Sequence, residues 1–284
     1  MCRRIKAGVI LRVAGTGTAG FSGDNGSALA ANIQAVALAV DASSNVYIAD
    51  STSHRIRRID ANGLITTIAG TGTAGFSADG SFASVAQLST PVGLAVGKDG
   101  SIYVADSGNS RVRRITNDGR IFTVAGNGSN AYNGDAGAAL LAGIGQPQRI
   151  ALASDGSLYI AHTDPALGGI YTRLRRVNPA NIITTLAGKV FDLTSAAHPI
   201  KDNLPAPQAA LNTALVLVIG ADGKLYVGDK LDARIYTLGN GLPGFNGANI
   251  PIPSQDGNEI FLFDPSGRHL QTIIVIGRKP DSRQ

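Results

Sequence analysis

The stretch IYVADSGNSRVRRITNDGRIFTVAG, residues 102–126, decides the fold. It holds three short apolar runs, at 102–106, 111–115 and 121–126. A fourth run, VGLAV at 92–96, precedes them, and the turn sequence KDG separates it from the first of the three. Val, Ile, Tyr, Phe and Thr favour pleated strands, and Asp-Gly and Gly-Asn pairs favour tight hairpin turns. The stretch therefore predicts four antiparallel strands joined by hairpins, which make one sheet.

The same order of strands recurs along the chain. Residues 16–70 carry VYIAD, RIRRI and ITTIAG, and residues 127–188 carry LYIAH, RLRRV and ITTLAG. The closing glycines of the units, Gly15, Gly70, Gly126 and Gly188, lie 55, 56 and 62 residues apart. Tandem four-stranded sheets with apolar faces predict a β-propeller. A TIM barrel is a poor alternative, because no helical segment of about 10–15 residues alternates with the strands.

The repeat also sets the expected boundaries. We expect a single propeller domain over residues 1–273, with a half blade at 3–15, blades at 16–70, 71–126, 127–188 and 189–239, terminal strands at 240–273, and an unstructured tail at 274–284. The half blade is expected because Arg3-Arg4-Ile5 aligns with Arg57-Arg58-Ile59, so that the chain begins midway through a blade. The opening basic and apolar residues do not predict a signal peptide, since Arg12 interrupts the apolar run. No apolar stretch approaches the roughly 20 residues that span a bilayer.

The cysteine content does not determine whether the protein belongs to a reducing or an oxidising compartment. Cys2 is the only cysteine, so no intrachain disulfide can form. The hydrophobic fraction of 44% is ordinary for a globular protein and argues against disorder of the chain.

The repeated phrases carry a resemblance to a known family. AGTGTAGFSGDNGSA, VYIADSTSHRIRRID and ITTIAG resemble NHL repeats, specifically the long units of teneurins and of bacterial RHS/YD-repeat proteins. The segment SQDGNEIFLFDPSGRHLQTI, residues 254–273, resembles the junction between that propeller and a YD-repeat shell. The resemblance implies a six-bladed, non-catalytic scaffold that recognises a protein or a glycan. It also implies a secreted or cell-surface parent protein with an attached YD-repeat shell.

Three aspartates end the second strand of their blades, and an arginine follows each of them. The pairs are Asp50 with Arg55, Asp106 with Arg111, and Asp229 with Arg234. A ring of carboxylates around a central channel would be a metal or substrate site. Recurrence in successive blades instead favours structural fastenings, in which each Asp pairs with the following hairpin and its Arg. We therefore expect no metal and no cofactor.

A second set of aspartates lies in the Gly-rich loops. Asp24, Asp79 and Asp135 lack the dense spacing of a calcium loop, so we expect them to form turn hydrogen bonds. The aromatic residues before them, Phe21, Phe76 and Tyr132, are expected to plug the space between blades.

The third unit breaks the repeat. His162 replaces the recurrent Asp, and the next hairpin, DPALGGIYT at 164–172, is enlarged. A catalytic His162 is the alternative to a drifted loop. We expect specificity to reside in the elongated loops at 127–146, 164–172 and 189–213. The candidate binding residues there are Tyr132, Asp135, His162, Asp164 and Tyr171.

The excess of arginine raises the question of nucleic acid, since the net charge is +5. The arginines belong to third strands and would be spread around the rim, and aromatic residues for base stacking are sparse, so we do not expect RNA binding. An enzyme of the amidating-lyase or gluconolactonase type is the other alternative. The four histidines occupy unlike positions, Glu259 is the only glutamate, and no nucleophile elbow is present, so we do not expect catalysis.

Overall fold

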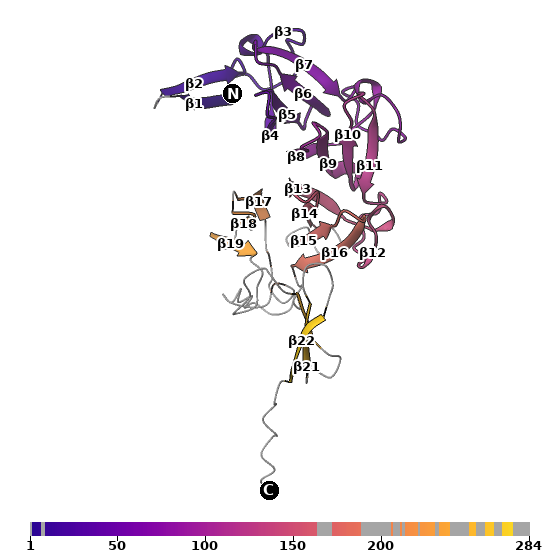
Figure 1. The fold of residues 1–284 in the computed structure, drawn as a ribbon. Coiled ribbons are helices and arrows are strands. Elements are labelled where there is room, and N and C mark those ends of the chain that lie inside the picture. Colours follow the sequence, from indigo (N-terminus) through magenta and orange to yellow (C-terminus); the bar gives the residue numbers. More distant parts are fainter. Residues whose placement is uncertain are drawn as a thin grey trace. The chain divides into compact units, whose positions relative to one another are not determined.

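The computed structural model describes residues 2–6, 9–163, 172–188, 214–220, 222–230, 233–238, 250–253, 259–263 and 269–274, together with residues 206 and 211. The chain divides into two compact units, residues 1–237 and 238–284 (Figure 1). The predicted loop at 189–213 and the predicted tail beyond residue 274 lie almost entirely outside the described residues.

The first complete sheet shows how each repeat folds. Strands β4 (Ala35–Val40), β5 (Val46–Asp50), β6 (Arg55–Ile59) and β7 (Leu64–Ala69) follow one another as antiparallel hairpins. The short strand β3 (Gly26–Ser27), from the Gly-rich loop, adds to the outside of β7, and a 3-10 turn at Ala28–Ala30 follows it. The loop is therefore fastened to the last strand of its own sheet.

The next two units repeat this plan. The second sheet has the order β11-β10-β9-β8, from β8 (Pro91–Val96), β9 (Ile102–Asp106), β10 (Arg111–Ile115) and β11 (Ile121–Ala125). The third has the order β12-β16-β15-β14-β13, from β12 (Gly137–Ala138), β13 (Gln146–Leu152), β14 (Leu158–Thr163), β15 (Thr172–Val177) and β16 (Ile182–Ala187). The predicted hairpin order is confirmed in both.

The sequence pattern weakens at both ends of the series. A fourth sheet contains β17 (Ala214–Ile219), β18 (Leu225–Asp229) and β19 (Arg234–Leu238) in that order. At the start of the chain, β1 (Cys2–Lys6) and β2 (Val9–Ala14) form a two-stranded antiparallel sheet.

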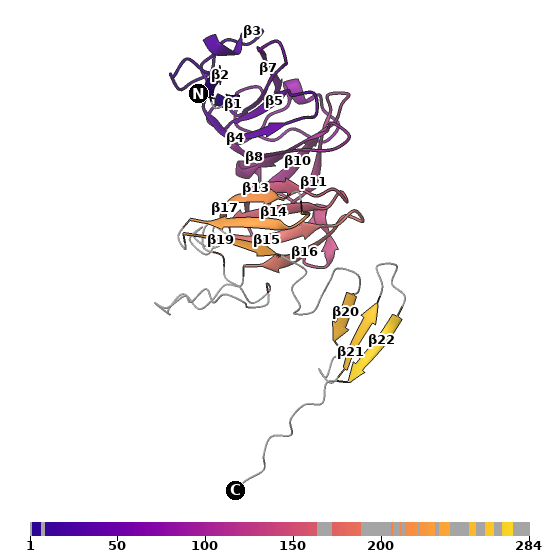
Figure 2. The same cartoon turned by 60° about the vertical axis from the view of Figure 1, so that its left-hand side comes forward.

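The sheets are arranged as propeller blades. Their first strands, β4, β8, β13 and β17, are successive neighbours (Figures 1 and 2). Side chains between the sheets form the core, because each sheet is apolar on both faces. Between the first two blades, Tyr47 and Ala49 pack in one cluster with Leu94, Ile102 and Val104. Both units contribute small and branched side chains to this cluster, which allows close packing.

The terminal strands form a separate unit. Strands β20 (Ile250–Pro253), β21 (Glu259–Phe263) and β22 (His269–Ile274) make a three-stranded antiparallel sheet. These strands lie in the segment 240–273, where the sequence predicts terminal strands, and they belong to the second compact unit, residues 238–284. Each of these strands pairs only within this short sheet, among the residues that are described.

Candidate functional site

The charged residues of the repeat gather in one recurring group, which we call the arginine cluster. Each cluster joins the aromatic residue and the Asp of the Gly-rich loop to two arginines, two positions apart on the third strand, and to a Thr of the fourth strand. The members are Phe21, Asp24, Arg55, Arg57 and Thr67 in the first blade; Phe76, Asp79, Arg111, Arg113 and Thr123 in the second; and Tyr132, Asp135, Arg173, Arg175 and Thr185 in the third.

The first cluster shows the geometry. The fully buried Arg57 donates from Nη2 to Asp24 Oδ1 at 2.7 Å and from Nε to the same oxygen at 3.1 Å. Its remaining donors reach the backbone carbonyls of Ser22 and Asn32. Thr67 donates its hydroxyl to Asp24 Oδ2. A buried guanidinium is stable only when its donors and charge are satisfied, and this arrangement supplies partners from three segments.

The aromatic ring lies against both arginines. Arg55 Cζ is 3.9 Å from the ring centroid of Phe21, and Arg57 Cζ is 4.8 Å from it. Both arginines reach one ring because residues two apart on a strand share a face. Phe21 is 39% exposed, so it is not the buried plug between blades that we expected. It covers the guanidinium groups and contributes a cation–π attraction.

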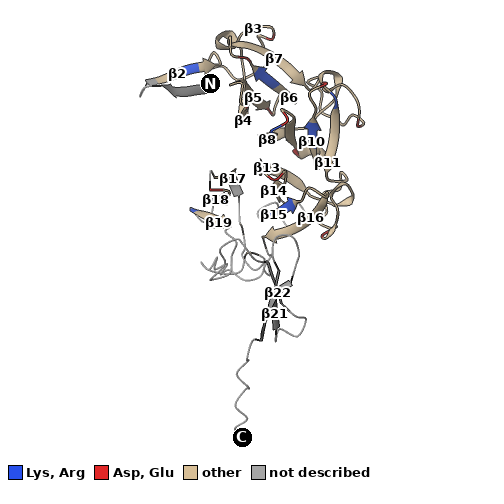
Figure 3. Cartoon of the chain, in the orientation of Figure 1, with Lys and Arg blue, Asp and Glu red and all other residues tan. Residues whose placement is uncertain are grey.

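A backbone irregularity directs the buried arginine. The register between third and fourth strands shifts immediately before Arg57, Arg113 and Arg175, which pair with Thr67, Thr123 and Thr185 respectively. A bulge at this point re-aims the side chains that follow it. Figure 3 shows in blue the basic residues on β6, β10 and β15.

The interactions within the cluster favour the charged form of the aspartate and oppose the effect of burial on the arginine. Burial by itself would raise the pKa of Asp135, but hydrogen bonds from Tyr132, Thr185 and Arg175 outweigh it and lower that pKa below its ordinary value. Burial lowers the pKa of Arg113, and the carboxylates of Asp106 and Asp79 oppose this effect. The central arginines are therefore internal counter-ions rather than a solvated rim, and three cations are not available to phosphate groups on the surface.

The predicted fastening of Asp50 to Arg55 is wrong, and so is the ion pair predicted between Asp106 and Arg111. Although each pair is directly opposed across its hairpin, the arginines turn to backbone carbonyls. Arg55 donates to Ser53 and Thr71, and Arg111 donates to Asn109 and Asn127. Each arginine reaches a carbonyl group in the loop that opens the next unit, and it also lies over the aromatic ring in the Gly-rich loop of its own unit.

The aspartates at the end of the second strands are buried. Asp106 accepts from Ser89 N and from Asn109 Nδ2, both at 2.7 Å, so it is fastened to its hairpin through a side-chain amide. Burial raises the pKa of Asp106 to about 6. Both carboxylate oxygens of Asp50 are buried without a hydrogen-bond partner, because Ser53 replaces Asn109 in this blade.

The fourth blade departs from the cluster at its central position. Asp229 is buried at the end of β18, and Arg234 begins β19 as predicted. Tyr236 stands where the other blades have the buried arginine, and the Gly-rich phrase with its Asp is missing from the sequence of this unit. The loop carboxylate and the central arginine are therefore lost together.

His162 occupies the position of the recurrent Asp in the third blade. The ring is fully buried, lies opposite Arg173 in the register, and stacks near Tyr132 with centroids 6.2 Å apart. Burial and the charges of Arg175 and Arg173 lower its pKa to about 3. No hydroxyl or thiol of the described residues hydrogen-bonds to its ring nitrogens. Near pH 7 the imidazole is therefore neutral and enclosed within the blade.

The candidate binding residues of the third unit have separate locations. Tyr132 and Asp135 belong to the third arginine cluster, where the Tyr132 hydroxyl donates to Asp135 Oδ2 at 2.7 Å. His162 lies beside them in the blade interior. Asp164 and Tyr171, in the enlarged hairpin, lie outside the described residues.

Within the described ranges, no group of three or more His, Cys, Asp or Glu side chains is placed to hold a metal ion. No helix in this part of the chain has the length and hydropathy needed to cross a membrane.

The sequence reasoning missed the central arginines and the threonines of the cluster. A signal was present, because Arg-x-Arg in the third strand recurs together with an aromatic residue and an Asp in the preceding loop. The fourth unit lacks the loop Asp and carries Tyr236 in place of the arginine, which indicates that the two positions act as a pair.

Comparison with known proteins agrees with this repeat architecture. The NHL repeat family matches residues 88–115, and the teneurin NHL domain family matches residues 114–239. Teneurin-4 of Mus musculus is 31% identical over 269 residues, which covers 88% of this chain and 10% of the relative. Teneurin-1 of Homo sapiens is 30% identical over 275 residues, which covers 90% of this chain and 10% of the relative. The chain thus spans about a tenth of the length of these proteins.

A solved structure shows a similar fold. A structural genomics protein of unknown function from Bacteroides thetaiotaomicron superposes with a TM-score of 0.52 at 20% identity, over 71% of this chain and 46% of that chain. The sequence matches and the blades together identify the chain as an NHL-repeat β-propeller related to the NHL domain of teneurins.

Proposed function

We propose that this propeller is a non-catalytic recognition module, which binds a protein or a glycan through the loops that interrupt the repeat. The observation that carries the proposal is the use of the repeated ionisable groups inside the blades. Arg57, Arg113 and Arg175 are buried against loop carboxylates, and Asp106 and His162 are buried at the ends of second strands.

A catalytic role would require these groups to contact a substrate and to have pKa values suited to proton transfer. The neutral, enclosed imidazole of His162 is a poor general base near pH 7, since its pKa is lowered to about 3. Asp106 uses both carboxylate oxygens for hydrogen bonds within its own blade. A rigid set of blades is instead suited to holding variable loops in fixed positions.

The relationship to teneurins supports an interaction domain, and it supports a cell-surface or secreted parent protein with a YD-repeat shell attached. The recognition loops on this proposal are those that depart from the repeat, at 127–146, 164–172 and 189–213. The partner is a protein or a glycan rather than RNA, because the arginine clusters remove three cations from the surface.

The test compares the whole chain with a loop variant. In the variant, residues 164–171 are replaced by SGNS, the turn of the second blade at 107–110. Both proteins are applied to an array of glycans and purified ectodomains. The proposal is supported if a ligand binds the parent chain but not the variant, and if the two proteins are equally stable.

Metal analysis supplies the opposing result. A stoichiometric zinc or calcium ion in the purified protein, released by His162→Ala or Asp106→Ala, would overturn the non-catalytic proposal in favour of a metal-dependent lyase or lactonase. Strong, salt-sensitive binding of single-stranded RNA would overturn the choice of partner.

A further inference from the structure

The second blade shows how a buried carboxylate at the end of a second strand is satisfied. Asp106 Oδ1 accepts from the backbone N–H of Ser89, and Asp106 Oδ2 accepts from the side-chain amide of Asn109, both at 2.7 Å. The same amide group donates to the carbonyl oxygen of Gly75, also at 2.7 Å. One NH₂ group therefore joins the carboxylate to the Gly-rich loop.

The first blade keeps the carboxylate but lacks both donors. Asp50 is 0% exposed, and among the described residues neither of its carboxylate oxygens has a hydrogen-bond partner. Ser53 stands where the second blade has Asn109, and its hydroxyl donates to the backbone carbonyl of Asp50 at 3.2 Å. The backbone donor is missing for a separate reason, since residues 33–35 lead into β4 where the four residues 88–91 lead into β8.

The neighbouring arginine does not compensate for this loss. Arg55 lies directly opposite Asp50 in the hairpin, but its guanidinium donates to the carbonyl oxygens of Ser53 and Thr71. In the part of the chain that the structure describes, no ion pair joins Asp50 to a basic side chain. A buried carboxylate without a donor is costly, and buried charges in proteins are paired or coordinate a cation.

The groups available around this carboxylate suit a small hard cation. Residues 16–22 and 71–77 have the same sequence, TGTAGFS, so the carbonyl of Gly20 corresponds to that of Gly75, which the Asn109 amide reaches. Carboxylate and carbonyl oxygens are ligands for alkali and alkaline-earth ions. Since no group of three acidic, His or Cys side chains forms within the described ranges, a single charge on the ion matches the single carboxylate.

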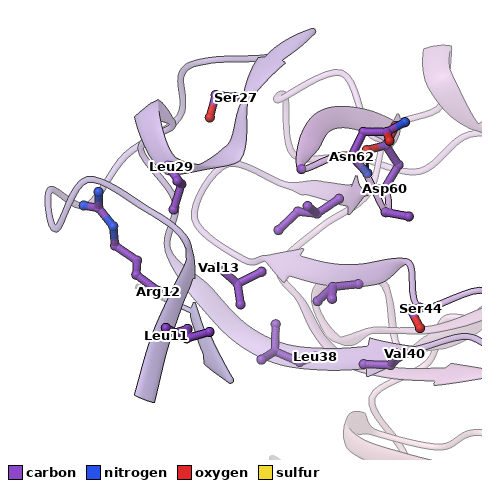
Figure 4. Close-up of a pocket in the computed structure, with 14 residues that line it drawn as sticks. Leu11, Arg12, Val13, Ser27, Leu29, Leu38, Val40, Ser44, Asp60 and Asn62 are labelled. Carbon is purple, nitrogen blue, oxygen red and sulfur yellow. Dashed lines mark hydrogen bonds between the residues drawn. The ribbon is translucent and has the colours of Figure 1, made fainter. Parts of the chain in front are cut away.

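The apolar groove of the first blade is not part of this arrangement. Its volume is about 770 Å³, and Ser44 and Val46, at the start of β5, line it together with aliphatic residues such as Leu38 (Figure 4). Asp50 ends the same strand and does not line the groove. A ligand of the carboxylate is therefore distinct from anything that the groove holds.

We infer that Asp50 binds a monovalent alkali-metal cation, Na⁺ or K⁺, in the position that the Asn109 amide takes in the second blade. The ion links the end of β5 to the carbonyl oxygen of the first Gly-rich loop and neutralises the buried carboxylate. It stabilises the blade and takes no part in ligand recognition. The inference is independent of the recognition loops, so either proposal can fail alone.

The experiment measures stability while the cation is exchanged. The full chain is melted at neutral pH in choline chloride, which is replaced stepwise by NaCl or KCl at constant ionic strength, with EDTA present to remove divalent ions. For at least one of the two salts, a saturable rise in melting temperature of about 2–4 °C is expected, because the ion binds the native state only. Equal melting temperatures in all three salts overturn the inference.

Two variants and a matched control locate the ion. Ser53→Asn supplies the amide of the second blade, so it should melt in choline chloride as the parent chain does in the saturating salt, with no further response. Asp50→Asn removes the charge and should also lose the response. Asp106→Asn changes the same position of the second blade, where protein groups supply the donors, and should keep the full response. A response that persists in Ser53→Asn, or that disappears in Asp106→Asn, contradicts the assignment.

The sodium NMR signal gives a direct readout that does not depend on stability. The parent chain should broaden the resonance of Na⁺, KCl should reverse the broadening by competition if K⁺ is the preferred ion, and Ser53→Asn should abolish it. If Ser53→Asn stabilises the chain equally in every salt and the parent chain broadens nothing, a water molecule or a proton satisfies Asp50 and the inference is wrong.

Discussion

The guanidinium of Arg57 and the carboxylate of Asp24 form an ion pair across 33 positions of sequence, with 2.7 Å between Nη2 and Oδ1. The arginine side chain is fully buried, whereas the carboxylate retains contact with solvent. The same relationship joins Arg113 to Asp79 and Arg175 to Asp135. The ion pair therefore fixes the Gly-rich loop onto the third strand of its own blade.

Removing one carboxylate should destabilise the blade. We predict that Asp79→Ala lowers the free energy of unfolding by about 1–3 kcal/mol, because it removes the ion pair and the hydrogen bond that the buried Arg113 makes with Asp79. Arg113→Met in the same chain should recover part of the loss, so that the two effects are not additive. Urea unfolding of the two single variants and the double variant measures this coupling. Asp118→Ala is the control, since its pair with Arg120 is exposed and its loss should leave the free energy of unfolding nearly unchanged.

Two equivalent glycines should respond differently to the same substitution. Gly17 and Gly72 both have positive φ, at +104° and +95°, so alanine strains the backbone at both positions. A Cβ on Gly72 would also meet the guanidinium of Arg55, whereas one on Gly17 would meet nothing within 4 Å. We predict that Gly72→Ala costs about 1–2 kcal/mol more than Gly17→Ala, because Arg55 loses its contacts with Thr71 and Phe21. In an Arg55→Ala background, equal costs are expected, and thermal unfolding in both backgrounds checks this.

His162 should make the protein sensitive to acid. Its folded-state pKa of about 3 lies below the ordinary value of 6.5, so the unfolded state binds the proton first as the pH falls. The stability that the neutral ring contributes is complete above pH 6.5 and is lost as the pH falls toward 3. With about 1.4 kcal/mol for each pKa unit, the loss is up to about 5 kcal/mol. His162→Asn should remove this part of the pH dependence, and a parallel loss in both proteins would contradict the assignment.

Asp106 should act in the opposite direction. Burial raises its folded-state pKa from 3.8 to about 6, so the native state holds its proton more tightly than the unfolded state does. Its contribution to stability is present below pH 3.8 and is lost as the pH rises through 6, by up to about 3 kcal/mol. The difference in unfolding free energy between Asp106→Asn and the parent chain should therefore increase from pH 4 to pH 7. A difference that stays constant over this range would show that Asp106 does not titrate there.

The sequence by itself determined the blades. Alternating β-branched residues and Asp-Gly or Gly-Asn turns act between neighbours along the chain, so the hairpin order of β8 to β11 and the positions of Asp50, Asp106 and His162 at the ends of second strands could be read directly.

Only the tertiary structure decided which charges meet. Asp50 and Arg55 are five residues apart and directly opposed, yet Arg55 turns to Thr71 and Phe21 in two different Gly-rich loops. The partner of Asp24 is Arg57, which a bulge in the register and the folding of the loop onto β7 bring to it. Local periodicity fixes the face on which a side chain lies, but the choice among partners on that face depends on burial and on packing between segments that are distant in sequence.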